Sequence, residues 1–383
     1  MNQIVDKPRY EILDGLRGVA ALIVLFYHHA EVFSGSTVLN NAIGHGYLAV
    51  DFFFLLSGYV ISYAYDDRWN KMLLGSFFKR RLIRLHPMIV FATIVGVVFF
   101  YFGASEMFPK IATCPWWKVL FAALCGLIML PMPISWDPRG WNEFCPINGN
   151  AWTLYFEYFA NITYALVIRR FNKFVLSGFV AASAFLTVAL AMNWDVFGVL
   201  TDRTMHAYTF VGGWELSPQH LFIGFTRLLY PFFGGILLAR LGGKFALRYG
   251  FWWCAIAIAA VLCVPCIAAN GVVSIWNGLF EAIVVLTVFP LIVAAGAGSA
   301  VAGRSAKICK WLGEISYPLY IVQYPIVFTL FGGWKTNHPE ASYGELWVVN
   351  IGTILLSIFL AWAALKLYDI PLRKYLIGKS KRF

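Results

Sequence analysis

The sequence has few charged residues. Only 13% of its 383 residues are Asp, Glu, Lys or Arg, whereas a typical soluble protein contains about 25%. The hydrophobic share is 60% and the mean hydropathy is +0.70, which exclude an ordinary soluble domain and favour a membrane protein. The aromatic share of 18%, with 34 Phe and 15 Trp, is typical of lipid-facing surfaces and interfacial belts.

A zinc-type spacing of cysteines, a cleavable leader and an internal repeat are also missing. Of the seven cysteines, Cys263 and Cys266 form a lone CxxC pair without a second pair to complete a zinc spacing, so no metal site is expected. The first apolar run, 18–33, is followed by no small-residue cleavage site and is expected to stay as the first crossing. Many secondary transporters contain repeats, so their absence here speaks against a transporter. We expect 1–383 to form one membrane-embedded domain without an appended soluble domain.

The net charge of +11 does not indicate nucleic-acid binding, because the basic residues form short clusters between apolar stretches. A crossing takes about 20 mostly apolar residues, and the sequence predicts an all-α, polytopic bundle of about ten such helices. The predicted crossings are 18–33, 46–65, 86–103, 151–168, 174–192, 221–239, 250–269, 276–298, 315–333 and 345–368.

One further apolar run, Lys118–Met132, is too short for a confident crossing and contains Gly126. If it does not cross and the N-terminus is cytoplasmic, the cytoplasmic side holds all but six of the 30 basic residues, as the positive-inside rule favours. The six exceptions are Lys110, Lys118, Arg139, Arg203, Arg227 and Lys335. We therefore expect this run to be re-entrant or to lie in an outer excursion over 104–150, with both termini cytoplasmic.

The outer loops 104–150, 193–220 and 334–345 are rich in Trp, Pro, Gly and His, and have potential for binding. Cys114 and Cys145 share the first of them. In an oxidising compartment they could form a disulfide, and two free thiols are the alternative.

Ionisable residues inside a crossing are candidates for function. His28 and His29 lie toward the outer end of the first helix, where one can act as a base while the other is structural. Glu157, in the helix that starts at Ala151, is a candidate to orient an imidazole. The alternative for all three is hydrogen bonding between helices without chemistry. Trp152 does not share the helical face of Glu157.

A basic cluster precedes the third crossing. Arg81 and Arg84 lie three residues apart, on one helical face, and Lys79 and Arg80 extend the cluster. Guanidinium groups bind phosphate bidentately, so the pattern indicates a phosphate site, and anchoring by the positive-inside rule is the alternative.

Four other residues are candidates for supporting roles. Asp14 and Arg17, also three apart, are expected to form an ion pair or to let Arg17 join the phosphate site. Asp51 opens the second crossing, and Ser57 lies deep in it beside Gly58. One interpretation is that Ser57 is a nucleophile. The alternative is close helix packing, which small residues at such depth usually serve.

A cationic cytoplasmic pocket and a histidine near the outer face suggest a donor whose phosphates stay inside while the chemistry occurs deeper. An acyl-CoA fits, because its pantetheine arm can enter a membrane channel while the nucleotide remains at the surface.

Several motifs occur in one order along the chain: ILDGLRGVAALIVLFYH, VDFFFLLSGYVIS, FFKRRLIRLHP, AWTLYFE, GEISYPLYIVQYPI and YDIPLRK. Together they resemble the acyltransferase 3 family of bacterial membrane O-acyltransferases. The resemblance implies an acyl donor, usually acetyl-CoA, that binds from the cytoplasm, with no permanently bound cofactor. It implies an acceptor hydroxyl on a cell-envelope glycan or lipid-linked saccharide, and a place among the lipids of the bacterial inner membrane.

By position in these motifs, the resemblance implies that His28 is catalytic, and that Arg81 and Arg84 hold the CoA phosphates or shape the donor channel. Arg17 and Glu157 would support the site. The other residues singled out from the motifs are Asp14, Asp51, Ser57, Lys79, Trp152, Ser316 and Tyr317.

Two positions depart from the family pattern: Gln323 stands where many relatives have His, and Thr153 where the family has Ser. Many relatives also have a soluble acyl-handling domain, so here the membrane part is expected to complete the transfer itself. His28 would act as a general base or as a transient acyl carrier. The competing functions are a transporter or flippase of a lipid-linked or polyanionic substrate, and a structural membrane subunit.

Overall fold

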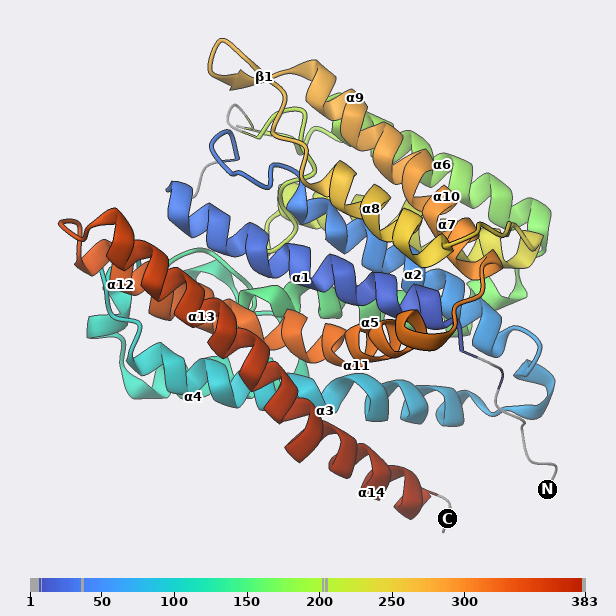
Figure 1. The fold of residues 1–383 in the computed structure, drawn as a ribbon, viewed down its shortest axis with the longest axis horizontal. Helices are drawn as coiled ribbons and strands as arrows, with labels where there is room; N and C mark the ends of the chain where they lie inside the picture. The colour runs from blue at the N-terminus through green and yellow to red at the C-terminus, as the bar shows by residue number, and fades with distance from the viewer. Residues whose placement is uncertain (1–6, 8, 36–37, 202, 204–205, 381–383) are drawn as a thin grey trace.

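The computed structural model describes residues 7, 9–35, 38–201, 203 and 206–380. The terminal segments 1–6 and 381–383, whose cytoplasmic placement the sequence predicts, lie outside the described residues. Within these, the chain forms a bundle of helices that run mostly along one direction (Figure 1).

The helices are α1 (Glu11–Ser34), α2 (Ala49–Tyr65), α3 (Leu74–Tyr101), α4 (Trp116–Ile128), α5 (Trp152–Leu166), α6 (Lys173–Ala191), α7 (Pro218–Leu241), α8 (Gly250–Leu262), α9 (Ile275–Ile283), α10 (Phe289–Gly298), α11 (Gly303–Pro325), α12 (Gly333–Asn337), α13 (Tyr343–Ala363) and α14 (Ile370–Ser380). Three π-helical segments are η7 (Val284–Val288), η8 (Ile326–Gly332) and η9 (Ala364–Asp369). Short 3-10 turns are η1 (Gly46–Leu48), η2 (Trp69–Lys71), η3 (Pro109–Thr113), η4 (Ile134–Trp136), η5 (Gly149–Ala151) and η6 (Ile168–Arg170). Strands β1 (Ala268–Ala269) and β2 (Val272–Val273) pair in antiparallel.

In the described part of the chain, eight helical stretches are long and apolar enough to cross a membrane, and each overlaps one predicted crossing. They are Glu11–Ser34, Gly46–Tyr65, Leu74–Tyr101, Lys173–Ala191, Pro218–Leu241, Ile275–Gly298, Gly303–Asn337 and Tyr343–Lys379. The prediction of an all-α, polytopic bundle is therefore confirmed.

The two remaining predicted crossings are shorter helices in the structure. α8 has 13 residues where the sequence predicts 250–269, because Pro265 follows its last turn and cannot continue it. α5 has 15 residues where the sequence predicts 151–168. Before α5 the chain forms only the 3-10 turn η5, and the Asn148 and Asn150 side chains donate to carbonyl oxygens of α11 at 2.6 and 2.9 Å.

Each π-helical segment lies within two residues of a proline, which is Pro290 after η7, Pro325 before η8 and Pro371 after η9. Proline lacks the N–H that an α-helix needs, so the neighbouring turns rearrange. The apolar run continues on both sides, and the three long crossings remain continuous helices with a local widening.

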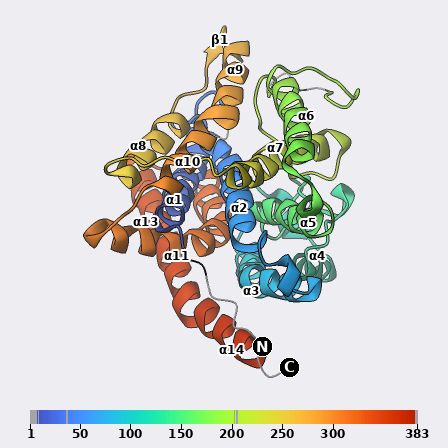
Figure 2. The same cartoon turned by 90° about the vertical axis from the view of Figure 1, so that its right-hand side faces the viewer.

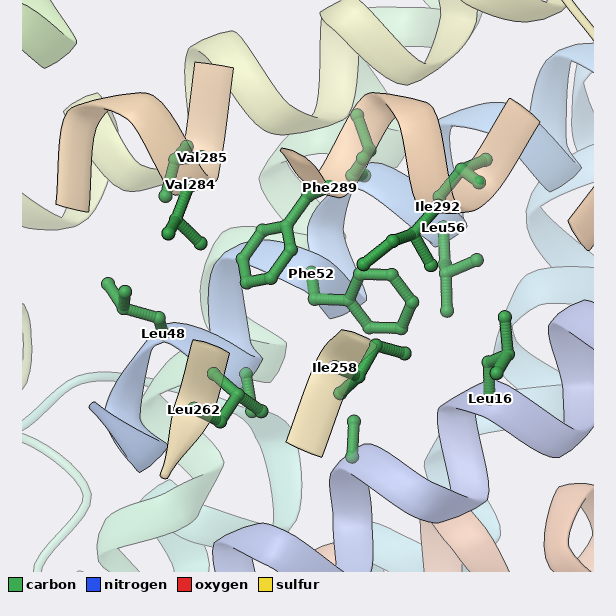
Figure 3. Close-up of a cluster of buried hydrophobic side chains, with 14 of the residues drawn as sticks. Leu16, Leu48, Phe52, Leu56, Ile258, Leu262, Val284, Val285, Phe289 and Ile292 are labelled. Atoms are coloured by element: carbon green, nitrogen blue, oxygen red, sulfur yellow. The ribbon is translucent and has the colours of Figure 1, made fainter. Parts of the chain in front are cut away.

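The largest hydrophobic cluster lies where α1, α2, α8 and α10 meet (Figure 3). The rings of Phe52 and Phe289 contact each other with centroids 5.3 Å apart. Leu16 and Ile258 close the cluster from α1 and α8, and all four side chains are buried. This packing fixes α1 against the helices around it.

α1 and α11 run in the same direction and in close contact. Arg17, near the start of α1, donates to Ser316 in the middle of α11 at 2.8 Å. Lys335, beyond the end of α11, donates to the carbonyl of Val32 near the end of α1 at 2.8 Å. A Cβ added at Gly18 would lie 2.4 Å from a backbone oxygen of α11, so only glycine permits this approach.

The connections rich in Lys and Arg lie at one end of the bundle, which we call the basic end. Arg240 pairs with Asp66 after α2 at 2.8 Å and donates to the carbonyl of Phe171 after α5 at 2.8 Å. The Arg169 guanidinium lies 4.2 Å from the ring centroid of Trp69. α1 and α11 begin at this end, on the right in Figure 1, and Figure 2 looks along the bundle from it, with α1, α2 and α11 central. We call the opposite end the far end.

α4 packs against the second half of α3 and is too short, at 13 residues, to cross a membrane. A Cβ at Gly126 would lie 3.2 Å from the side chain of Thr93, and Leu127 hydrogen-bonds His86. The irregular segment 146–151 that follows is buried inside the bundle, as irregular backbone at membrane depth must be. This arrangement agrees with the predicted re-entrant or outer-loop segment.

Cys114 and Cys145 are both free thiols. Cys145 instead lies near Cys125 of α4. Of the two alternatives that the sequence leaves open, the structure therefore has the free thiols.

Candidate active site

Arg17 is held firmly at the basic end. Asp14, one turn earlier on α1, pairs with it at 3.0 Å, as the spacing predicts. Across the helix interface, the Arg17 guanidinium donates to Ser316 Oγ at 2.8 Å and to the carbonyl oxygen of Gly313 at 3.0 Å. Three of the predicted residues thus meet at one point, and 26% of the Arg17 side chain stays exposed there.

Glu157 joins α2, α3 and α5. Its Oε1 accepts hydrogen bonds from Arg81 Nη2 at 2.7 Å and from Ser57 Oγ at 3.0 Å. The Arg81 side chain is only 8% exposed and that of Glu157 18%, so the ion pair is largely shielded from water. Asn161 donates to the backbone oxygen of Glu157 at 2.6 Å and steadies this turn of α5.

Arg84 and Lys79 lie at the exposed surface of the same cluster. Arg84 is close enough to Arg17 and Arg81 to interact electrostatically with both. The hydroxyl of Tyr317 donates to the backbone carbonyl of Leu85 at 2.7 Å, which fastens α11 to α3 one turn beyond Arg81. Arginines from α1 and α3 therefore converge at the basic end, as a phosphate site requires.

His28 lies in the far half of α1. Its Nδ1 is 2.9 Å from Oε2 of Glu31, and the rings of Tyr324 and Phe328 stand edge-on to it at 6.3 and 5.4 Å. Nε2 forms no hydrogen bond to any residue in the described ranges. An imidazole that donates from Nδ1 to a carboxylate presents Nε2 as its basic nitrogen. The expected partner is thereby corrected: Glu31 contacts the imidazole, whereas Glu157 is bound to Arg81.

His29 has a different environment. Its Nδ1 lies 2.8 Å from the carbonyl oxygen of Leu25 and its Nε2 3.2 Å from Thr353 Oγ1. The ring stacks on Phe331 with centroids 5.8 Å apart and is almost fully buried. Both nitrogens of His29 are thus engaged, which is the arrangement expected of the structural member of the histidine pair.

Asp51 and Trp152 belong to a second polar cluster around Arg227. Arg227 Nη2 lies 2.7 Å from Asp51 Oδ2 and donates to the carbonyl of Tyr47 at 2.7 Å. Its guanidinium carbon lies 5.4 Å from the ring centroid of Trp152, and Nη1 donates to Gly212 at 3.3 Å. Asp51 is fully buried in this pair and does not reach the arginines of the basic end. Sequence reasoning placed Arg227 outside and missed the pair.

Arg17 and His28 lie on nearly the same face of α1, since their spacing is about three full turns, and the helix separates them by ~16 Å. On α11, Ser316 stands beside the first and Tyr324 beside the second. Gln323 is fully buried, and neither amide atom has a hydrogen-bond partner in the described structure.

A sequence model described as an acyltransferase domain matches residues 10–366. The chain belongs to the acyltransferase 3 family. Together with its long apolar helices, this membership makes it an integral membrane protein. The resemblance to the acyltransferase 3 family that the sequence motifs predict is therefore confirmed over nearly the whole chain.

Relatives of this acyltransferase family member differ in how much of their length they share with it. Protein 2 in the picA locus of Rhizobium radiobacter is 33% identical over 41% of this chain and 81% of its own. O-acetyltransferase OatA of Staphylococcus aureus is 26% identical over 96% of this chain, and the match spans 58% of OatA. Acyltransferase MdmB of Streptomyces mycarofaciens is 26% identical over 91% of this chain and 87% of its own. No solved structure matches the chain at a significant level.

Two further features of this acyltransferase family member bear on its chemistry. Thr153, where the family has Ser, keeps a hydroxyl, which lies 3.0 Å from the hydroxyl of Tyr320. Over the described residues, no three His, Cys, Asp or Glu side chains are grouped to hold a metal ion.

Proposed function

We propose that this protein transfers an acyl group, acetyl in the simplest case, from a cytoplasmic acyl-CoA to a hydroxyl of a cell-envelope glycan or lipid-linked saccharide. The observation that carries the proposal is the placement of Arg17 and His28 on one face of α1. Arginines gather at one end of this helix and an unengaged imidazole nitrogen lies ~16 Å along it. An extended pantetheine arm is of comparable length.

At the basic end, Arg84 and Lys79 would meet the phosphates of the donor. Both are exposed, whereas Arg17 and Arg81 already have carboxylate partners at 3.0 and 2.7 Å. Phosphate offers guanidinium the same bidentate geometry as carboxylate. Arg17, with a quarter of its side chain exposed, can therefore share a phosphate without losing Asp14.

At the far end, Nε2 of His28 would take the proton of the acceptor hydroxyl while the oxygen attacks the thioester carbonyl. Collapse of the tetrahedral intermediate breaks the C–S bond, and the imidazolium returns the proton to the CoA thiolate. Glu31 stabilises the imidazolium through Nδ1. In a second route, Nε2 attacks the thioester itself and the acyl-imidazole then passes its acyl group to the hydroxyl.

The orientation we propose follows from charge. The basic end faces the cytoplasm, as the positive-inside rule favours, so both termini are cytoplasmic and the protein resides in the bacterial inner membrane. Acyl-CoA is then a donor substrate rather than a permanently bound cofactor, and the acceptor reaches His28 from the outer side.

The test measures free CoA thiol released from acetyl-CoA by detergent-purified protein, with a crude lipid-linked glycan extract as acceptor. Wild type is compared with His28→Ala. Because general-base catalysis contributes about 10²–10⁴-fold, the substitution should lower acceptor-dependent release by that factor with unchanged thermal stability. Near-full activity of His28→Ala would remove His28 from the role. Absence of both thiol release and donor binding in the wild type would favour a transporter or flippase instead.

A further inference from the structure

A polar cavity of about 160 Å³ opens at the far end, between the loop that precedes α7 and the first turn of α7. It is roughly ten times the ~15 Å³ that admits one water molecule. The lining that matters here consists of Arg203, His206, Trp214, Glu215, Gln219 and His220. None of these residues takes part in the donor site or contacts His28.

Two of the lining residues have polar atoms that the protein itself leaves unpaired. Gln219 Oε1 and Arg203 Nε are buried without a partner in the described structure. Such groups cost stability unless something satisfies them. Glu215 lies 3.7 Å from Nε2 of His220, and the Trp214 ring packs edge-on against the same imidazole at 5.2 Å. Unused donors and acceptors beside an aromatic side chain are typical of a small-molecule site.

The cavity is electrostatically connected to the His28 site. Burial and the Arg203 cation lower the pKa of His206, whereas the carboxylate of Glu31 raises it. Glu31 is the residue that holds His28 at 2.9 Å. The carboxylate of Glu31 thus acts on both the His28 imidazole and one residue of the cavity lining, which does not itself include His28.

We propose that this cavity binds one sugar ring of the acceptor, next to the ring whose hydroxyl is acylated. The proposal rests on the function proposed above. A sugar ring carries hydroxyls that both donate and accept, which suits a lining that combines the donors of Arg203 with the acceptors of Glu215 and Gln219. Its apolar face suits packing against Trp214. A hydrocarbon chain would leave the polar groups unsatisfied, and a simple anion would meet the carboxylate of Glu215.

The experiment fills the cavity with Gln219→Trp and compares it with Leu216→Trp, which places the same side chain at an exposed position just before α7, outside the cavity lining. CoA release is measured against the amount of glycan extract and, separately, against acetyl-CoA. In Gln219→Trp the half-saturating amount of extract should rise by about tenfold or more, with the KM for acetyl-CoA unchanged. Leu216→Trp should behave as wild type.

An unchanged extract dependence in Gln219→Trp, or an equal effect of Leu216→Trp, would overturn the proposal. If Gln219→Trp does not fold, Trp214→Ala replaces it, with the same expected and contrary results. If the wild type releases no CoA at all, the proposed function fails separately, and the cavity is tested by thermal unfolding with glycan extract. Stabilisation of the wild type but not of Gln219→Trp supports the sugar site, and no stabilisation of the wild type rejects it.

Discussion

The ion pair between Arg81 and Glu157 provides a sharp test of how the basic end works. Both residues are candidates for the site from sequence, and their side chains are 8% and 18% exposed at a separation of 2.7 Å. If the pair mainly holds α3 against α5, removal of one partner will destabilise the protein. If Arg81 mainly binds donor phosphate, removal will chiefly raise the KM for acetyl-CoA.

The magnitude can be worked from the geometry. Two unit charges 2.7 Å apart attract by roughly 6 kcal/mol at an effective dielectric constant of about 20. Desolvation of the buried guanidinium offsets part of this. Removal of one partner leaves the other charge shielded and unpaired, at an expected cost on the order of 3 kcal/mol. We therefore expect Arg81→Met and Glu157→Gln each to lower the unfolding temperature clearly.

The double variant Arg81→Met/Glu157→Gln closes the cycle. Since it leaves no unpaired charge, its loss should be smaller than the sum of the single losses by about 1–3 kcal/mol. Arg84→Met is the matched control one turn along the same face of α3, because Arg84 is exposed and should raise the donor KM without loss of stability. Full additivity in the cycle, or wild-type stability of Arg81→Met, would refute the reasoning.

Two other expectations address the far end and the topology. Glu31→Gln should lower acceptor-dependent CoA release by about 10- to 100-fold with the donor KM unchanged, because a hydrogen bond to a charged group contributes about 1.5–3 kcal/mol. Glu106→Gln, at an exposed position, is the control. An unchanged rate in Glu31→Gln would contradict the role assigned to Glu31. In a chain freed of its native cysteines, single cysteines at Lys173 and Lys244 should react only with a membrane-permeant thiol reagent, while one at Lys110 reacts from outside. Outward labelling of Lys173 or Lys244 would invert the topology.

Much of the fold is predictable because apolar length is a local property. Eight of the predicted crossings correspond to long helices, but the run at 151–168 yields the 15-residue α5. The helix ends at Leu166, before the 3-10 turn η6, and the chain ahead of it bonds α11 through the Asn148 and Asn150 side chains. These partners are distant in sequence, so no hydropathy pattern indicates them.

The contacts of the candidate site also divide into those that follow from local spacing and those that depend on tertiary packing. The Asp14–Arg17 pair follows from helical spacing, and Glu31 beside His28 has the same spacing and could have been found in that way. The pairing of Asp51 with Arg227 joins α2 to α7. A buried acid and a buried base indicate that some partner exists, but only the tertiary packing identifies which one.

The packing of α1 on α11 fixes the position of the donor-phosphate site relative to His28. Gly18 allows backbone contact between the helices, and the Arg17–Ser316 hydrogen bond fixes their register at the basic end. An α-helix cannot stretch, so the ~16 Å between Arg17 and His28 is set by the number of residues between them. A donor anchored by its phosphates at the basic end can then present its thioester to His28 only if its arm matches that length. The selectivity for a CoA-like donor would thus reside in the length of one helix as much as in the arginines that bind it.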